Sequence, residues 1–242
     1  MKTIVVTGAA GGIGSAIITR LADENMAIIA CDKDAAKLEK VASQVRKKHP
    51  RTRLDTRHFD ITDHKAMIHF GENLRKTELY GLVNNAGIYL GRDLFHYSPD
   101  AMQTVLQTNL FSAIHLSQIV GNVLVKNKRP GVIVNVSSIA AFEGSSDALY
   151  GTTKAGLIGL TRSCALTFAP WVRVNAIAPG LVDTPLIDAI PKWRRKEFER
   201  GERLKGRITP ASVAASVWFL LSDESRHTTG SVLDLNNGGY FR

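Results

Sequence analysis

Short apolar runs alternate along the chain with longer stretches whose apolar residues recur every three or four positions. The first run, Thr3–Thr7, is apolar and β-branched, as in a parallel strand that is buried on both faces of a sheet. Similar runs predict further strands at residues 26–31, 54–59, 81–83, 132–136, 171–176 and 231–235.

Apolar residues at helical spacing fill the gaps between these runs and predict a helix in each gap. Three helices carry start signals: Thr62 is a candidate cap, and Ser98-Pro99 and Thr209-Pro210 each place proline at a first helical position. Helices are expected at residues 13–21, 35–45, 63–74, 98–125, 147–168 and 210–221. Alternating strands and helices predict an α/β fold, a doubly wound parallel sheet flanked by helices.

No linker or repeat divides the chain, so we expect residues 1–242 to form a single domain. Residues 185–207 interrupt the alternation, are rich in charge, and lie between a strand and the last helix. Long insertions in compact domains are often lids, so we expect a substrate lid here.

The composition excludes several classes of protein. With 44% hydrophobic and 22% charged residues, the 242-residue chain can build a sizeable core and is not disordered. Two cysteines, Cys31 and Cys164, cannot form a disulfide framework and favour a reducing, cytoplasmic compartment. The seven histidines show no zinc-ligand spacing, so no metal site is expected. No apolar run approaches the ~20 residues of a membrane span, and no signal peptide is expected before the first strand.

The charge balance leaves a nucleic-acid partner open at this point. Lys and Arg number 31 against 22 Asp and Glu, a net charge of +9 with a pI near 9.7. The largest concentration lies in residues 191–207, which hold eight basic residues against Glu197, Glu199 and Glu202. The basic residues are Lys192, Arg194, Arg195, Lys196, Arg200, Arg203, Lys205 and Arg207. This stretch fits either a solvated lid helix of mixed charge or a surface that recruits an anionic substrate.

The first strand runs into the glycine-rich turn Thr7-Gly8-Ala9-Ala10-Gly11-Gly12-Ile13-Gly14 and then into a helix. Glycines let the backbone approach a dinucleotide pyrophosphate, and the helix N-terminus attracts its charge. The sequence therefore predicts a dinucleotide site at this turn.

Asp32 closes the second strand and is a candidate to bind the adenosine ribose. A carboxylate there accepts hydrogen bonds from both ribose hydroxyls and repels a 2′-phosphate, which favours NAD over NADP. Gly11 also leaves no basic residue in the turn, although Lys33 could reach a 2′-phosphate. The alternative is that Asp32 caps the helix that begins near Asp34.

Tyr150 and Lys154 are four residues apart on a predicted helix, so their side chains share one face. An adjacent ammonium favours the phenolate and lowers the pKa of tyrosine, which makes Tyr150 a candidate general acid and base. Ser137 and Ser138 end the preceding strand, at the edge where doubly wound sheets bind ligands.

Together these motifs resemble the short-chain dehydrogenase/reductase family over essentially the whole chain. The glycine turn, Asp60-Ile61, Asn84-Asn85-Ala86-Gly87 and Asn109 match family motifs in order. So do Ser138, Tyr150, Lys154, Asn175, Pro179-Gly180, Thr184, Thr229-Gly230-Ser231 and Gly238-Gly239.

The resemblance implies a Rossmann-type fold and hydride transfer between NAD(H) and a secondary alcohol or ketone. Tyr150 would move the hydroxyl proton, Ser138 would bind the developing oxyanion, and Lys154 would bind the nicotinamide ribose and tune Tyr150. Asn109 would anchor a water in a proton relay, with the helix loosened around it; alternatively, its side chain is simply satisfied by solvent. The cofactor would contact Gly8, Gly11, Gly12, Ile13, Gly14, Asp32, Asp60, Ile61, Asn85, Ala86, Gly87, Tyr150, Lys154, Pro179, Gly180, Val182 and Thr184.

One spacing departs from the family pattern. Ser138 and Tyr150 are 12 residues apart, where the family usually shows 13, so either the intervening loop is shorter or Ser137 takes the catalytic role. Neighbouring strand residues face opposite sides, so only one serine can face the substrate. We assign the role to Ser138, because the family's catalytic serine is usually the second of such a pair.

The resulting interpretation is an oxidoreductase whose substrate is a 3-oxoacyl thioester or another anionic carbonyl compound. Within the lid, Trp193 and Phe198 either close over the substrate or pack the lid helix against the body. The resemblance also implies a homotetramer, with no nucleic-acid or membrane partner. The alternatives are a dinucleotide-binding regulatory or nucleic-acid-binding protein without turnover, and an epimerase or dehydratase that shares the Tyr-x-x-x-Lys pair.

Overall fold

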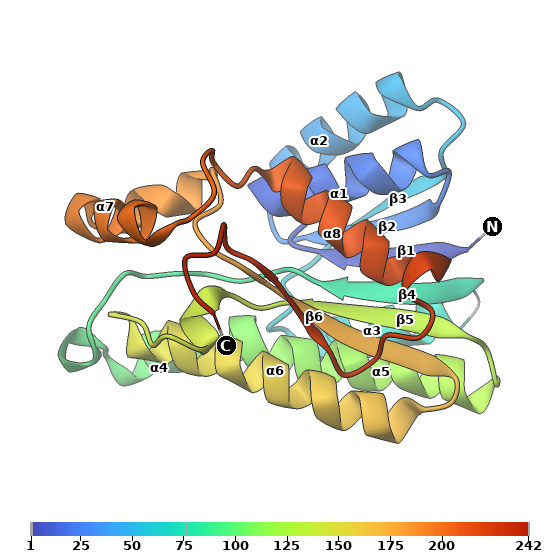
Figure 1. Ribbon diagram of the computed structural model, residues 1–242. Coiled ribbons are helices and arrows are strands. Elements are labelled where there is room, and N and C mark those ends of the chain that lie inside the picture. The colour runs from blue at the N-terminus through green and yellow to red at the C-terminus, as the bar shows by residue number, and fades with distance from the viewer. Residues whose placement is uncertain (1, 76, 242) are drawn as a thin grey trace.

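The computed structural model describes residues 2–75 and 77–241, so Met1, Lys76 and Arg242 of the expected domain lie outside it. Strands and helices alternate along the described chain (Figure 1). The strands are β1 (Thr3–Thr7), β2 (Ala27–Asp32), β3 (Leu54–His58), β4 (Leu79–Asn84), β5 (Gly131–Val136), β6 (Val172–Pro179) and β7 (Val232–Leu235). The α-helices are α1 (Gly12–Asp23), α2 (Ala35–Lys48), α3 (His64–Leu74), α4 (Pro99–Leu106), α5 (Ser112–Lys126), α6 (Ala148–Phe168), α7 (Lys192–Gly201) and α8 (Pro210–Leu221). Shorter turns are η1 (Leu94–His96), η2 (Gln107–Phe111), η3 (Ile139–Ala141), η4 (Pro185–Ala189) and η5 (Asp223–Ser225).

The seven strands form one parallel sheet in the order β3-β2-β1-β4-β5-β6-β7. The predicted doubly wound α/β fold is therefore confirmed. The chain moves outward from β1 to β3, then crosses back to β4 and continues the other way. The loops after β1 and β4 consequently diverge and leave a crevice at the carboxyl edge of the sheet.

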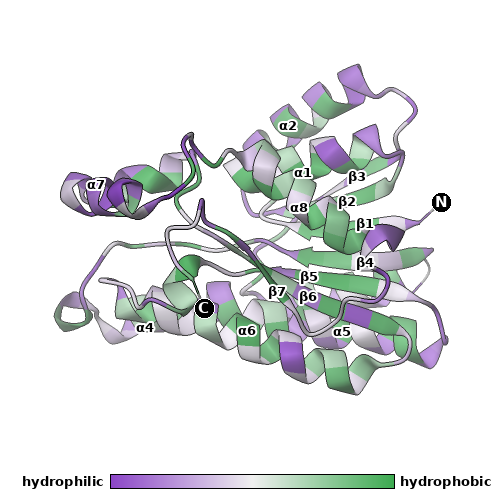
Figure 2. Ribbon diagram, in the orientation of Figure 1, coloured by the Kyte–Doolittle hydropathy of each residue, from purple (hydrophilic) through white to green (hydrophobic). Residues whose placement is uncertain are grey.

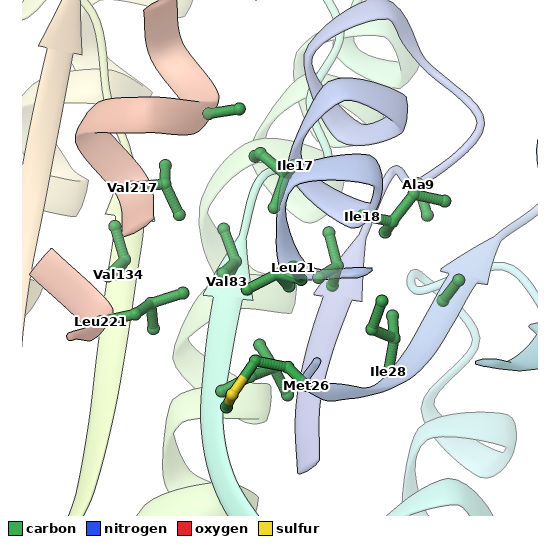
Figure 3. Close-up of a cluster of buried hydrophobic side chains, with 14 of the residues drawn as sticks. Ala9, Ile17, Ile18, Leu21, Met26, Ile28, Val83, Val134, Val217 and Leu221 are labelled. Atoms are coloured by element: carbon green, nitrogen blue, oxygen red, sulfur yellow. The ribbon is translucent and has the colours of Figure 1, made fainter. Parts of the chain in front are cut away.

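Helices cover both faces of the sheet and enclose two apolar cores. On one face, α1 and α8 pack side by side with α2 beyond them, and α3, α5 and α6 cover the other face (Figure 1). Figure 3 shows Ile17 and Leu21 of α1 and Val217 of α8 meeting Val83 and Val134 of the strands. Apolar strands fill the middle of the molecule, whereas polar residues lie outward on the helices (Figure 2). The fully buried strands explain why β1 reads as an unbroken apolar run.

Two details differ from the sequence prediction. The expected long helix over residues 98–125 is not continuous but divided into α4, the π-helical turn η2 and α5; the wide turn lies around Asn109, where the resemblance implied a loosened helix. The cap of α3 is Asp63 rather than Thr62: the Asp63 carboxylate accepts from the backbone N–H groups of Lys65 and Ala66, whereas the Thr62 hydroxyl donates to Asp60.

The expected lid segment folds into η4 and α7, and α7 projects beyond the carboxyl edge of the sheet (Figure 1). Polar residues cover most of α7 (Figure 2). Cys31 and Cys164 are buried and free. None of the helices in residues 2–75 and 77–241 is both long and apolar enough to span a membrane.

Candidate active site

The glycine turn joins β1 to α1, and two of its glycines are required by close backbone approach. Gly8 has φ +63°, and a Cβ there would lie 2.9 Å from the Cα of Ala86. A Cβ on Gly14 would collide with the carbonyl oxygen of Gly8, because α1 packs directly against the turn. A Cβ on Gly12 would lie 2.9 Å from the Cγ2 of Thr184. The turn is therefore shaped by backbone packing on three sides, and its outer face lines a cleft.

Asp32 lies at the end of β2 and faces this turn. Its Oδ2 accepts from the backbone N–H of Ala10 at 2.9 Å, and its Oδ1 accepts from the N–H of Asp34 at 3.0 Å. The cap of α2 is Asp34, whose carboxylate accepts from the N–H of Lys37. The alternative capping role for Asp32 is thus filled by Asp34, and Asp32 presents its charge to the cleft.

The end of β4 is tied to the end of β1 by side chains. The hydroxyl of Thr7 accepts from the N–H groups of Asn85 and Ala86, both at 3.1 Å. The amide of Asn85 donates to the carbonyls of Thr7 and Gly8 at 2.9 and 3.2 Å. These bonds hold the segment around Gly87 beside the glycine turn.

Asn109 lies in the π-helical turn η2 and is fully buried. Its amide donates to the carbonyl of Ile88 at 2.9 Å and accepts from the N–H of the same residue at 2.8 Å. The amide nitrogen also lies 3.3 Å from the hydroxyl of Thr153. The alternative of a solvent-satisfied side chain is therefore wrong. Asn109 clamps the loop after β4, while its role in a proton relay stays a prediction.

The two serines at the end of β5 turn in different directions. The Ser137 hydroxyl is buried and donates to the backbone carbonyl of Lys154 at 2.7 Å. The Ser138 hydroxyl accepts from the N–H of Ala140 at 3.2 Å and lies beside Tyr150. This geometry favours Ser138 over Ser137 as the serine that meets the substrate.

Burial dominates the protonation of the Tyr150 and Lys154 side chains. It raises the pKa of Tyr150 to about 12, and the neighbouring Ser138 hydroxyl counteracts part of that rise. Burial also lowers the pKa of Lys154 to about 8. The Nζ of Lys154 donates to the carbonyl of Val136 at 2.9 Å and lies 5.5 Å from the Tyr150 ring centre. The lowering of the Tyr150 pKa that the sequence suggested is therefore not seen, because desolvation by burial is the largest influence on this pKa.

Two hollows meet at the carboxyl edge. We call them the long cleft, which runs from the glycine turn past Asp32, and the inner pocket, which contains Tyr150. They share the lining residues Ile13, Asn85, Gly87, Thr184 and Leu186. Of the predicted site residues, the long cleft also takes Gly8, Gly11, Gly12, Gly14, Asp32, Asp60, Ile61 and Ala86, and the inner pocket takes Ser138, Tyr150, Lys154, Pro179, Gly180 and Val182. Asn109 lines neither hollow and acts from behind.

The lid segment lines the inner pocket through its apolar residues and one arginine. Phe198 and Arg194 of α7 reach the pocket, with the guanidinium 4.6 Å from the Phe198 ring centre, and Arg194 pairs with Glu197 at 2.7 Å. Trp193 is 64% exposed, so of the two lid aromatics only Phe198 lines the inner pocket.

Sequence reasoning missed two residues around Tyr150. Tyr89 lines the inner pocket, and its ring meets that of Tyr150 edge-on, with centres 5.1 Å apart. Asp147 is completely buried at the start of α6. An aromatic residue two positions after the Asn-Asn-Ala-Gly motif and an Asp at a helix start were both visible signals, but neither pattern specifies a contact with Tyr150.

Comparison with known proteins places this geometry in a family. The model of the short chain dehydrogenase family matches residues 2–195. The chain belongs to the short-chain dehydrogenase family. It is 32% identical to a 3-oxoacyl-[acyl-carrier-protein] reductase of Thermotoga maritima, over 98% of this chain and 97% of that protein.

Two solved structures superimpose closely on the chain. A protein from Beutenbergia cavernae, described as an NAD(P)-dependent gluconate 5-dehydrogenase and holding NADP, gives a TM-score of 0.93 at 30% identity, covering 98% of this chain and 96% of that one. A 3-oxoacyl-[acyl-carrier-protein] reductase from Brucella melitensis with bound NAD gives 0.89 at 28% identity, covering 100% and 92%. The family's oxidoreductase chemistry is thereby established for this chain at the level of class.

The different environments of the two serines predict different effects of their removal. Ser138→Ala should lower kcat by about 100-fold or more, because an oxyanion donor is lost. Ser137→Ala should change kcat little, since the Ser137 hydroxyl donates its hydrogen bond to the Lys154 carbonyl of α6 and is not free to bind substrate. Steady-state kinetics of both variants measure this, and the reverse ranking would transfer the role to Ser137.

The lowered pKa of Lys154 predicts a pH dependence of stability. Between about pH 8 and the ordinary lysine pKa near 10.5, the unfolded chain binds a proton at this side chain that the folded chain does not. The contribution of Lys154 to the free energy of unfolding should therefore rise with pH, by about 2 kcal/mol from pH 8 to 9.5 at ~1.4 kcal/mol per unit. Urea unfolding of wild type and Lys154→Met across this range measures the difference. A difference that is flat with pH would contradict the prediction.

Proposed function

We propose that the protein transfers a hydride between NAD(H) and the carbon of a secondary alcohol or carbonyl substrate. The observation that carries the proposal is the joining of the two hollows: Ser138, Tyr150 and Lys154 line the inner pocket, which opens into the long cleft at the glycine turn. Because a Cβ at Gly8 or Gly14 would collide with neighbouring backbone, these positions of the turn carry no side chain. Such a turn at the start of α1 can approach a dinucleotide pyrophosphate closely.

The bound nicotinamide supplies or accepts the hydride, and the side chains of the inner pocket handle the proton. Tyr150 gives its phenolic proton to the carbonyl oxygen in reduction and takes the hydroxyl proton in oxidation. Ser138 donates a hydrogen bond to the same substrate oxygen and steadies its developing charge. Lys154 would bind a ribose hydroxyl, and a protonated Lys154 beside Tyr150 would favour the phenolate against the effect of burial.

Asp32 supports NAD over NADP. The Asp32 carboxylate, at the end of β2, is held by the backbone N–H groups of Ala10 and Asp34. Its negative charge is therefore fixed beside the place where a 2′-phosphate would lie. Lys37 lines the same cleft but pairs with Asp34 at 3.0 Å, which reduces its attraction for a phosphate. Relatives hold either cofactor, since the Brucella reductase binds NAD and the Beutenbergia protein binds NADP.

The lid supports an anionic substrate, such as a 3-oxoacyl thioester. Lys196 and Arg200 are exposed on α7, which stands over the inner pocket, and no ion pair is found for either within the described residues. Their field would draw an anion toward the pocket mouth. The related 3-oxoacyl-[acyl-carrier-protein] reductases take a substrate of this class by name.

The expected homotetramer stays a proposal. Phe111 of η2 and Leu166 of α6, two elements in contact with each other, are 43% and 83% exposed. Apolar side chains exposed on one helical layer support an interface between copies.

A panel of ketones and secondary alcohols, assayed with NADH and NADPH separately, tests the reaction and the cofactor. We expect turnover with higher kcat/KM for NADH, lost in Tyr150→Phe. Asp32→Ser should lower the NADH:NADPH ratio of kcat/KM by about 10-fold or more, because the charge that repels the 2′-phosphate is removed. Asp55→Ser, on the neighbouring strand and outside the cleft, is the matched control. An unchanged ratio in Asp32→Ser, or salt-sensitive DNA binding without turnover, would contradict the proposal.

Recruitment by the lid is tested with the double variant Lys196→Glu, Arg200→Glu. At low salt its KM for an anionic carbonyl substrate should rise several-fold, and the rise should disappear at high salt. Lys47→Glu, Arg51→Glu makes the same change of net charge at the end of α2 and in the turn that follows it, and serves as control. Equal KM values for the two double variants would remove the recruitment idea.

A further inference from the structure

Asp147 is a buried carboxylate without a cationic partner. Its side chain is 0% exposed, and no Lys or Arg of residues 2–75 and 77–241 forms an ion pair with it. Burying a charge is costly unless hydrogen bonds replace the lost water. Three groups supply them here: the backbone N–H groups of Tyr150 and Gly91, and the phenol of Tyr97.

All three partners donate hydrogen bonds, so this place suits a carboxylate, whose two oxygens both accept. One oxygen, Oδ1, accepts from the N–H of Tyr150 at 3.0 Å, and the other, Oδ2, accepts from the N–H of Gly91 at 3.1 Å. The Tyr97 hydroxyl lies 2.9 Å from both oxygens. An asparagine amide in this place would turn its NH₂ group against a backbone N–H whichever way it was flipped, because each oxygen position faces a donor that cannot rotate.

Asp147 therefore joins the start of the helix that carries Tyr150 to the loop after β4. The same loop is held further upstream by Asn109, which binds both backbone groups of Ile88. Tyr89 lies between these two anchors, at Ile88 and Gly91, and its ring meets Tyr150 edge-on. Tyr150 is thus fixed at its backbone by Asp147 directly and at its ring by a residue of the loop that Asp147 holds.

We propose that Asp147 is a positioning residue for Tyr150, acting through the first turn of α6 and through the loop that carries Tyr89. The inference rests on the proposed function, in which Tyr150 moves the proton. Asp147 does not line the inner pocket, so it acts on the reaction through Tyr150 rather than on the substrate.

The charge of Asp147 also acts on Tyr150. The groups around the phenol are Ser138, Tyr89 and Lys154, and the negative charge of Asp147, although bonded elsewhere, contributes to the raised pKa of Tyr150. Arg92 acts on the Tyr97 end of the network in the opposite sense. Removing the carboxylate charge lowers the pKa of Tyr150, whereas merely displacing the tyrosine does not move it in a set direction.

The test is the pH profile of alcohol oxidation in Asp147→Asn. We expect kcat to fall by about 10- to 100-fold, as for a misplaced catalytic group, and the acid limb of the profile to move to lower pH. Tyr97→Phe keeps the charge and removes the phenol donor, so kcat should fall several-fold while the acid limb stays at or above its wild-type pH. Asp63→Asn makes the same substitution at the cap of α3, outside both hollows, and should leave kcat and profile unchanged.

An unchanged kcat in Asp147→Asn would overturn the proposal, and so would a lower kcat with the limb unmoved, which marks a purely structural role. If Asp147→Asn does not fold, Tyr97→Phe carries the test, and wild-type kcat in that variant overturns it. If wild type shows no turnover, the proposed function fails instead. In that case the pKa of the Tyr150 phenol is measured by NMR titration of tyrosine-labelled protein, and Tyr150→Phe identifies the Tyr150 signal. An unchanged pKa in Asp147→Asn overturns the proposal.

Discussion

The site depends on what happens where β1 and β4 part. Inside the sheet, the two strands are held by backbone hydrogen bonds, but the chain leaves β1 toward α1 and leaves β4 in the other direction. Beyond that point, side-chain hydrogen bonds take the place of the backbone hydrogen bonds between β1 and β4. The Thr7 hydroxyl and the Asn85 amide satisfy backbone groups that would otherwise be left unpaired in a crevice. The crevice can stay open because its walls are bonded to each other at its base.

Buried polar side chains extend this arrangement across the sheet. The amide of Asn84 donates to Asn135 on β5 at 2.8 Å, and Asn135 in turn donates to Thr161 on α6, also at 2.8 Å. Both asparagines are 4% exposed or less, so these bonds form in an environment of low dielectric constant, where hydrogen bonds are strong. They fix the rotation of α6 relative to the strands, and therefore the direction in which its Tyr150 and Lys154 face.

The fold could be predicted from the sequence because parallel strands buried on both faces leave an unmistakable run of apolar residues, as in Thr3–Thr7. Many residues that line the two hollows could be predicted from short motifs that follow strands, such as the glycine turn after β1 and Ser138 after β5. Tyr150 and Lys154 lie on α6 instead and were predicted from their four-residue spacing. What could not be predicted is set by long-range contact. The sequence assigned Lys154 to tuning Tyr150, yet burial of both groups decides their pKa values, and burial depends on the lid and the loops. The choice between Ser137 and Ser138 likewise rests on which hydroxyl meets the backbone of α6.

The wide turn η2 gives one continuous helical rod two registers. A π turn inserts one extra residue into the α-helical repeat, so the faces of α4 and α5 are rotated by roughly 100° relative to each other. The rod can therefore bury the aliphatic side of α5 against the sheet and, a turn earlier, direct the polar Asn109 to the loop after β4. A regular helix of the same composition would have to give up one of these contacts. The extra residue therefore lets α5 pack against the sheet while Asn109 still reaches the loop after β4.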